Sequence, residues 1–255
     1  VGGDPASANA TPLACADAPE KSTLYVDGIS PSDVRQGEIG DCTLQASLSS
    51  LARTLPGKAF LRGRIHENRD AAEGVTSYTV SLYRKTSAGA FQPVKVDVPA
   101  RCLASRGFAH AVSADGEVEA WPRVFEQAML TVNGGKPCND MPEAMGILTG
   151  KPAVDSPTSE AGLENALLRG FGAGKVQVLS TTGALAADQD DPKLKAGHAY
   201  TLVGIEAHPQ RRADGSYEMT LLYTVRNPWG YDQPRPLTID EVKKYFSTYS
   251  QGDVP

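Results

Sequence analysis

The amino-acid sequence predicts an α+β protein with two lobes, a helix-rich lobe followed by a β-rich lobe. Apolar residues with helical spacing are prominent in the first part of the chain, and β-rich runs separated by turn residues dominate the second part. A length of 255 residues is sufficient for two compact lobes that share a cleft. The 25 glycines and 18 prolines are spread along the chain without a repeat, which indicates many loops within a globular fold.

Charge and cysteine content argue against several classes of protein. The chain has 25 Lys and Arg residues against 30 Asp and Glu residues, a net charge of −5, and its pI is about 5.4, so nucleic-acid binding is not expected. No apolar run approaches the roughly 20 residues of a membrane-spanning helix, so no membrane partner is expected. The absence of a CxxC pair argues against a zinc ribbon or a thioredoxin-type site, and the pairing of Cys15, Cys102 and Cys138 stays open.

The first 150 residues divide into an arm and a helix-rich lobe. Residues 1–21 are rich in Ala and Pro without periodicity, which predicts a flexible arm, and residues 22–150 form the predicted lobe. Leucines at positions 44, 48, 51 and 55 predict a helix with one buried face, ended by Pro56-Gly57. Further along the chain, the patterns predict a hairpin from residues 76–84 and 91–98 and a second helix over residues 121–132.

Residues 151–255 are predicted to form the β-rich lobe. Runs of apolar and β-branched residues bounded by turn residues predict its strands. Thr238 is the expected N-cap of a closing helix. The predicted elements are a short helix over 160–169, strands over 176–180, 199–206 and 217–225, and a helix over 237–245.

Cys42 is the candidate nucleophile because it stands where a Gly-rich turn becomes a helix. Unpaired N–H groups and the positive end of the helix dipole at that position favour the reactive thiolate. A small buried core residue is the alternative interpretation of this cysteine. Six residues upstream, Gln36 is the candidate oxyanion donor, acting together with a backbone N–H at the helix start. A solvated loop glutamine is the alternative there.

His198, at the head of an apolar strand, is the candidate general acid and base for this cysteine. Asn227, at the end of another strand, would accept the second ring N–H of the histidine and fix its orientation, and Trp229 would shield that hydrogen bond. A structural histidine and a strand-ending turn are the alternatives. The order Gln, Cys, His, Asn nevertheless matches the layout of papain-like proteases.

Several segments resemble the protease core of the calpain family. They are YVDG (25–28) through QGEIGDC (36–42), EAWPRVFEQAMLTVNGG (119–135), LTG (148–150), GHAYTLVGIE (197–206) and VRNPWG (225–230). The resemblance covers most of residues 24–247 and implies a papain-like two-lobed fold, as an isolated catalytic core of bacterial type. It implies the roles given above: Cys42 as nucleophile, His198 as acid and base, and Asn227 as the orienting residue. Gln36 becomes the oxyanion donor and Trp229 the shielding residue.

The chain departs from the calpain pattern at two places. Thr43 follows the nucleophile where the family usually has tryptophan, so the shape of the cleft floor is expected to differ. Calpain cores are typically activated by calcium, and Val26, Gly28 and Asp33 fall where one family calcium site draws ligands. The glutamate expected just before the LTG stretch is replaced at residues 146–147, and a cage without its second carboxylate should bind calcium weakly. The sequence therefore predicts no metal ligands, no cofactor and no calcium requirement.

These observations predict a cysteine endopeptidase that hydrolyses amide bonds of a protein or peptide through a Cys42 thioester. Two alternatives use the same residues: a glutamine deamidase or transglutaminase, and a pseudoprotease that binds a partner through the cleft. The intact Cys42, His198 and Asn227 argue against the pseudoprotease. The small size and the Ala/Pro-rich leader are typical of a bacterial effector or toxin module that is secreted or delivered into a target cell. Its partner would then be a cognate inhibitor or immunity protein.

Overall fold

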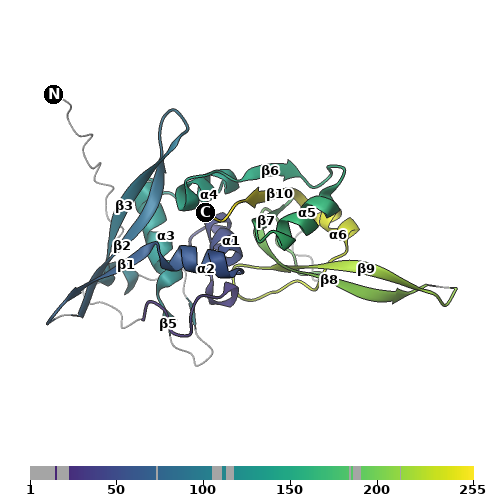
Figure 1. Cartoon of the computed structure of the whole chain (residues 1–255), viewed down its shortest axis with the longest axis horizontal. Helices are drawn as coiled ribbons and strands as arrows, with labels where there is room; N and C mark the ends of the chain where they lie inside the picture. The colour runs from purple at the N-terminus through teal and green to yellow at the C-terminus, as the bar shows by residue number, and fades with distance from the viewer. Residues whose placement is uncertain are drawn as a thin grey trace.

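The computed structural model describes residues 15, 23–72, 74–104, 111–112, 118–183, 185, 191–212 and 214–255. It is a mixed α+β fold whose adjacent strands run antiparallel (Figure 1). The predicted α+β class is confirmed. Apart from Cys15, the predicted arm over residues 1–21 lies outside the described residues.

Two sheets carry most of the strands, one ordered β1-β2-β3 and the other β6-β10-β7-β8-β9, with a short β4-β5 ribbon beside them. The strands are β1 (Ile65–Asp70), β2 (Gly74–Lys85), β3 (Phe91–Pro99), β4 (Ala111–Val112), β5 (Val118–Glu119), β6 (Val154–Pro157), β7 (Val176–Thr181), β8 (Ala199–Arg211), β9 (Tyr217–Arg226) and β10 (Phe246–Gly252). The helices are η1 (Pro31–Asp33), α1 (Cys42–Leu51), α2 (Leu55–Arg62), η2 (Ala100–Ala104), α3 (Trp121–Val132), α4 (Met141–Thr149), α5 (Leu163–Gly172) and α6 (Ile239–Tyr245).

Helix α1 lies at the centre of the molecule and is buried at every residue after Cys42 (Figure 1). It packs against η1, α4, β7 and β8, so both parts of the chain contact it. The prediction that this helix runs to Leu55 was wrong. The helix ends at Leu51, and Pro56-Gly57 opens α2, where a proline in the first turn costs no hydrogen bond and the Thr54 hydroxyl caps the Gly57 N–H.

The predicted hairpin and second helix of the first part are confirmed as β2, β3 and α3. Strand β1 was not predicted because its sequence, IHENRD, is polar; it pairs with β2 at the edge of the sheet. Helix α4 was also missed. Its N-cap is Asp140, whose carboxylate accepts the Glu143 N–H at 2.8 Å, and its C-cap is Gly150, whose φ of 81° favours glycine.

In the second part, the three predicted strands are confirmed as β7, β8 and β9, and the two predicted helices as α5 and α6. Thr238 caps α6 in a reciprocal arrangement with Glu241: each side chain accepts the backbone N–H of the other residue. Strand β10, a polar run that sequence reasoning missed, inserts between β6 and β7 and completes the five-stranded sheet.

The buried apolar side chains form two clusters. One joins α1, α3 and α4 to the three-stranded sheet, and the other packs α5 and α6 against β8 and β9. Val176, Val178 and Ala199 belong to the first cluster, so β7 and the start of β8 pack directly onto it. The division into lobes at residues 150 and 151 stays a prediction. Across the described ranges, no helix has both the length and the apolar character that a bilayer crossing requires.

A disulfide joins Cys15 to Cys102, which answers the pairing question that the sequence left open. Cys138 is a buried free thiol, and Cys42 is also free. The candidate nucleophile is therefore available for reaction.

Candidate active site

A cleft of about 640 Å³ lies where the start of α1 meets the turns before β8 and after β9. Gln36, Cys42, His198 and Trp229 line it. The fifth predicted residue, Asn227, is fully buried and hydrogen bonds to His198. The structure thus brings together all five residues that the sequence singled out.

The hydrogen bonds around Asn227 determine which nitrogen of His198 carries the proton. The Trp229 backbone N–H donates to Asn227 Oδ1 at 3.0 Å, so this atom is the amide oxygen. His198 Nε2 lies 2.9 Å from the same oxygen and must therefore donate its hydrogen to it. In the neutral ring, Nδ1 is then the unprotonated nitrogen. Asn227 selects the tautomer in which His198 can accept a proton at Nδ1.

Aromatic rings enclose the imidazole of His198. The centroid of the Trp229 ring lies 4.7 Å from that of the imidazole, and the Tyr200 ring meets the imidazole edge-on at 5.0 Å. Burial lowers the pKa of His198; the hydrogen bond to Asn227 raises it, and the Lys195 cation lowers it further. The ring is therefore held mainly in its neutral form.

Cys42 is the first residue of α1, where backbone N–H groups have no partner within the helix. Burial nevertheless raises the pKa of its thiol; the Ala199 backbone lowers this pKa, and the Asp41 charge raises it. The expectation that the helix start favours the thiolate is thus corrected, because desolvation outweighs the helix terminus in the free cleft. Together with the lowered pKa of His198, this favours an uncharged thiol and imidazole.

Gln36 reaches the cleft from the loop between η1 and α1. Its backbone N–H donates to the Pro228 carbonyl at 2.8 Å, which ties this loop to the turn that carries Asn227. Its side-chain Nε2 donates one hydrogen to the Ile39 carbonyl at 2.7 Å. The second hydrogen of that amide remains for an incoming oxyanion.

Two residues that sequence reasoning missed hold the backbone of the candidate pair. The Thr181 hydroxyl accepts the His198 N–H at 2.9 Å. Gln233 bonds to both backbone groups of Asn227: its Oε1 accepts the N–H at 2.9 Å and its Nε2 donates to the carbonyl at 3.0 Å. Nothing in the local sequence marked either residue, because each contact depends on how the chain returns to the cleft.

Arg226, the neighbour of Asn227, joins the end of β9 to the segment that follows η1. Its Nη2 donates to the Val34 carbonyl at 2.6 Å and to the Ser32 carbonyl at 3.2 Å. Burial and the nearby Arg35 lower its pKa to about 10, so the guanidinium is still charged at neutral pH. Arg226 belongs to the VRNPWG segment, and nothing in that segment indicates these contacts.

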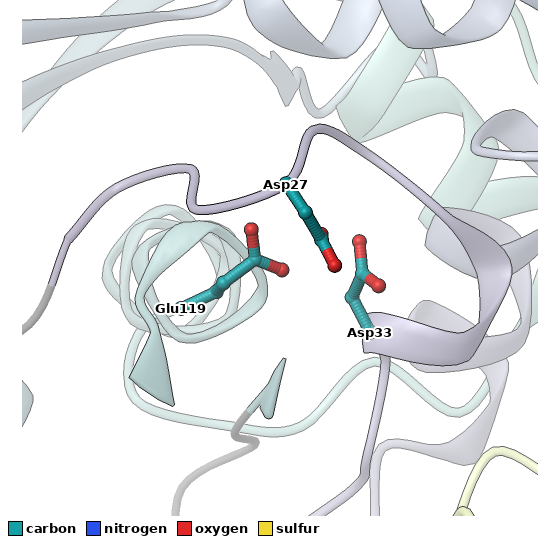
Figure 2. Close-up of side chains that lie close together, drawn as sticks. All are labelled: Asp27, Asp33 and Glu119. Atoms are coloured by element: carbon teal, nitrogen blue, oxygen red, sulfur yellow. The ribbon is translucent and has the colours of Figure 1, made fainter. Parts of the chain in front are cut away.

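A second polar centre lies in the first part of the chain. Asp27, Asp33 and Glu119 direct their carboxylates toward one another, and their ligand atoms lie within 4.8 Å of each other (Figure 2). Burial, with the charges of the two aspartates, raises the pKa of Glu119 to about 7, and burial raises the pKa of Asp33. We call these three residues the acidic cluster.

The acidic cluster fits a calcium ion. Calcium takes oxygen ligands at about 2.3–2.6 Å, so ligand atoms on opposite sides of one ion lie about 4.8 Å apart. Glu119 is fully buried, and its Oε2 has no hydrogen bond from the described residues. Residues 146–147, where the family's glutamate was expected to be replaced, lie buried in α4 and bear no carboxylate, whereas Glu119 joins Asp27 and Asp33 in the cluster. The expectation of no calcium requirement stays a prediction.

The fold and the cleft define a cysteine peptidase domain, in which a free thiol and a histidine bound to a buried asparagine face one cavity. The family model described as "Calpain family cysteine protease" matches residues 12–237. The chain belongs to the calpain family of cysteine proteases. Its catalytic chemistry therefore implies a peptide substrate.

The similarity extends to curated calpains from animals. The chain is 30% identical to Calpain-9 of Mus musculus over 225 residues, which is 83% of this chain and 30% of that protein. It is 26% identical to Calpain clp-1 of Caenorhabditis elegans (82% of this chain, 26% of that protein) and 27% identical to the Calpain-1 catalytic subunit of Bos taurus (81% and 28%). The chain thus spans less than a third of the length of these relatives.

Proposed function

We propose that the chain is an endopeptidase of papain-like two-lobed architecture that cleaves protein amide bonds through a thioester on Cys42. One observation carries the proposal: His198 Nε2 is bound to Asn227 Oδ1 in the cleft that also exposes Cys42. This leaves His198 Nδ1 as the base. Calpain-family membership supports the same chemistry.

In the first half of the reaction, His198 Nδ1 takes the thiol proton as Cys42 Sγ attacks the carbonyl carbon of the substrate. The carbonyl oxygen becomes an oxyanion, which the free Gln36 hydrogen and the Cys42 backbone N–H stabilise. The C–N bond then breaks, and the imidazolium returns its proton to the leaving amine. The acyl group remains on Cys42 as a thioester.

In the second half, water replaces the amine. His198 Nδ1 takes a proton from water as its oxygen attacks the thioester carbon, and the same oxyanion donors act again. The C–S bond breaks, the carboxylic acid leaves and Cys42 recovers its proton. Burial raises the pKa of Cys42 and lowers that of His198, and both shifts favour movement of the proton as the substrate is attacked.

Cleavage of a protein substrate tests the proposal, with new termini identified by mass spectrometry. Cys42→Ala should reduce cleavage by at least about 10⁴-fold, because it removes the attacking atom. Cys138→Ala is the matched control, since Cys138 is the other free cysteine in the described residues and is buried outside the cleft lining. Equal cleavage by the Cys42 variant and the parent would overturn the proposal.

The same experiment separates the alternatives. A glutamine deamidase would add about one dalton to the substrate without new termini, and a transglutaminase would join the glutamine to an amine. A pseudoprotease would leave the substrate unchanged, and Cys42 would not react stoichiometrically with a thiol-directed activity probe.

We further propose that the acidic cluster binds calcium when the ion is present. Asp27, Asp33 and Glu119 would be ligands, and the family resemblance adds the carbonyls of Val26 and Gly28. The ion would neutralise the charge of the three carboxylates and has no step in the peptide chemistry. Thermal unfolding with calcium, with magnesium and with chelator tests this directly: a calcium-specific rise in melting temperature is expected.

The biological setting is proposed as that of a bacterial effector or toxin, with a cognate inhibitor as partner. The Ala/Pro-rich composition of residues 1–21 supports this setting. Production of the parent chain in a host cell should slow growth, whereas the Cys42→Ala variant should not. Equal growth with both chains would remove the toxin part and leave the peptidase part intact.

A further inference from the structure

Two buried carboxyl groups lie near the start of the helix that carries the candidate nucleophile. Asp41 precedes Cys42 and is 1% exposed, and Glu126 on α3 is fully buried. The side-chain amide of Gln45 spans them: its Nε2 lies 2.9 Å from Asp41 Oδ2 and 3.2 Å from Glu126 Oε1. One amide group, one turn into α1, thus binds carboxyl groups from two parts of the chain.

The two carboxyl groups share one donor, the Gln45 amide. The second Asp41 oxygen, Oδ1, is buried and accepts no N–H or hydroxyl hydrogen from the described residues. Carboxylate oxygens only accept, so a hydrogen bond between two carboxyl groups requires a proton on one of them. Burial raises the pKa of Asp41, which is consistent with a retained proton.

The charge of this pair acts on Cys42. An ionised Asp41 raises the pKa of the neighbouring thiol, whereas Glu126 is not among the groups that shift it. The location of the single negative charge within the pair therefore matters: on Asp41 it opposes thiolate formation, and on Glu126 it acts from farther along α3.

We propose that Asp41 and Glu126 share one proton, held in place by Gln45, and that this pair is a positioning element that limits the negative charge beside Cys42. The role of the pair in catalysis rests on the proposed function, whereas its effect on the reactivity of the Cys42 thiol does not. Asp41 is also the N-cap residue of α1, and its carbonyl accepts the Gln45 N–H at 3.1 Å. The pair thus anchors the segment that presents the nucleophile.

Other ionisable groups lie on α1 and α3, on the elements packed against them, or just ahead of these elements. These groups are Asp33 on η1, Cys42 on α1, Glu119 ahead of α3, Arg123 on α3, Cys138 ahead of α4 and His198 ahead of β8. None of them is among the groups that shift the pKa of Asp41, which are Gln45, Glu126 and the backbone.

Alkylation of Cys42 by iodoacetamide tests the inference without a substrate. The rate is followed by mass spectrometry of the Cys42 peptide between about pH 4 and pH 8. Asp41→Asn leaves the charge on Glu126 and should speed alkylation at neutral pH by about threefold to tenfold, because the thiol pKa falls by up to about one unit. Glu126→Gln leaves the charge on Asp41 and should slow alkylation by a similar factor. Both replacements preserve size and hydrogen bonding.

Opposite effects of the two replacements are the decisive result, because a purely structural role would move both rates in the same direction. Changes of equal sign, or unchanged rates in both variants, would overturn the inference. Asp155→Asn is the matched control: the pKa of Asp155 is also raised by burial, but it bonds to Ser250 in the β6–β10 pair and does not line the cleft.

One further measurement keeps the outcome interpretable. The melting temperatures of the variants show whether each protein is folded at the pH of the alkylation experiment. If the parent cleaves no peptide but the opposite alkylation effects are present, the proposed function fails and the inference stands.

Discussion

The catalytic cleft and the acidic cluster are both polar and partly buried, but they satisfy their polar groups in different ways. In the cleft, Asn227 Oδ1 accepts hydrogens from His198 and from the Trp229 backbone, so donors and acceptors match. In the acidic cluster, Asp33 and Glu119 face each other with acceptors only, and Asp27 adds another. The hydrogen bonds of Asn227 are thus completed within the chain, whereas the cluster requires a proton or a cation from outside.

This difference teaches which centre can be regulated. A complete network has one low-energy arrangement and keeps it under most conditions. A cluster of like charges changes with pH and with metal concentration, because either a proton or calcium relieves the repulsion. The cluster is linked to the cleft through Asp33, since Arg226 binds the carbonyls of Ser32 and Val34 on either side of it.

The largest effect should come from breaking the complementarity of the cleft. Asn227→Ala removes the acceptor that selects the His198 tautomer, so kcat should fall by about 10²- to 10⁴-fold while KM changes little. Steady-state kinetics on a fluorogenic peptide measure this. Asn139→Ala, at a cleft-lining position outside the His198 network, is the control, and an equal loss of kcat in that variant would contradict the assigned role.

The next effect concerns the acidic cluster, whose repelling carboxylates should destabilise the metal-free protein at neutral pH. The folded-state pKa of Glu119, about 7, is above its unfolded value of about 4.5, so the native state binds more protons between these values. The free energy of unfolding of the metal-free protein should therefore fall as pH rises from about 4.5 to 7, by up to about 3 kcal/mol.

Glu119→Gln should remove this pH dependence, stabilise the metal-free protein at neutral pH and weaken calcium binding. Urea unfolding at several pH values, with chelator, and calorimetric titration with calcium measure the three changes. Asp240→Asn, at an exposed position in the first turn of α6, is the control. A destabilised Glu119→Gln protein at pH 7 would show that the three carboxylates do not repel one another.

A smaller effect is expected from cutting the connection between the two centres. Arg226→Met keeps the length of the side chain but removes the donors to Val34 and Ser32, so the free energy of unfolding should fall by about 1.5–3 kcal/mol. The kcat should also fall, because Gln36 and Asn227 are no longer held together on this side. Arg212→Met, on an exposed arginine of the β8–β9 hairpin, controls for the loss of charge.

The smallest effect is a shift of the pH profile. His198 must be neutral to accept the thiol proton, and burial lowers its pKa. The acidic limb of kcat/KM should therefore lie below the ordinary histidine value of about 6.5, and the alkaline limb, set by the raised thiol pKa of Cys42, above about 8.5. A profile measured with the peptide substrate checks both limbs; an acidic limb above 6.5 would indicate a different base.

The sequence could predict the cleft better than the cluster, for a physical reason. Cys42, His198 and Asn227 each stand in a local context, a helix start or a strand end, that indicates a role without knowledge of contacts. Glu119 reaches Asp33 only because β5 is brought beside Thr23 by an isolated bridge, a pairing across almost a hundred residues that no local pattern encodes. No sequence pattern therefore grouped Glu119 with the two aspartates.

The fold shows the same limit. Strands β7, β8 and β9 were predictable from apolar and β-branched runs, whereas β10 has the polar sequence FSTYSQG and becomes a strand because β6 and β7 pair with it on both sides. The pKa of Cys42 shows the same limit for electrostatics. The helix start could be predicted from the sequence, but the burial that raises this pKa could not.

The contacts of Arg226 have a consequence for how this protein tolerates change during evolution. The guanidinium binds main-chain carbonyls, which are present whatever side chains occupy positions 32 and 34. Substitutions that alter the surface at Ser32 can therefore accumulate without loosening the junction between the end of β9 and the segment after η1. Substitutions at position 32 should therefore be tolerated as long as position 226 keeps its arginine. A library of variants should show strong selection at 226 and weak selection at 32.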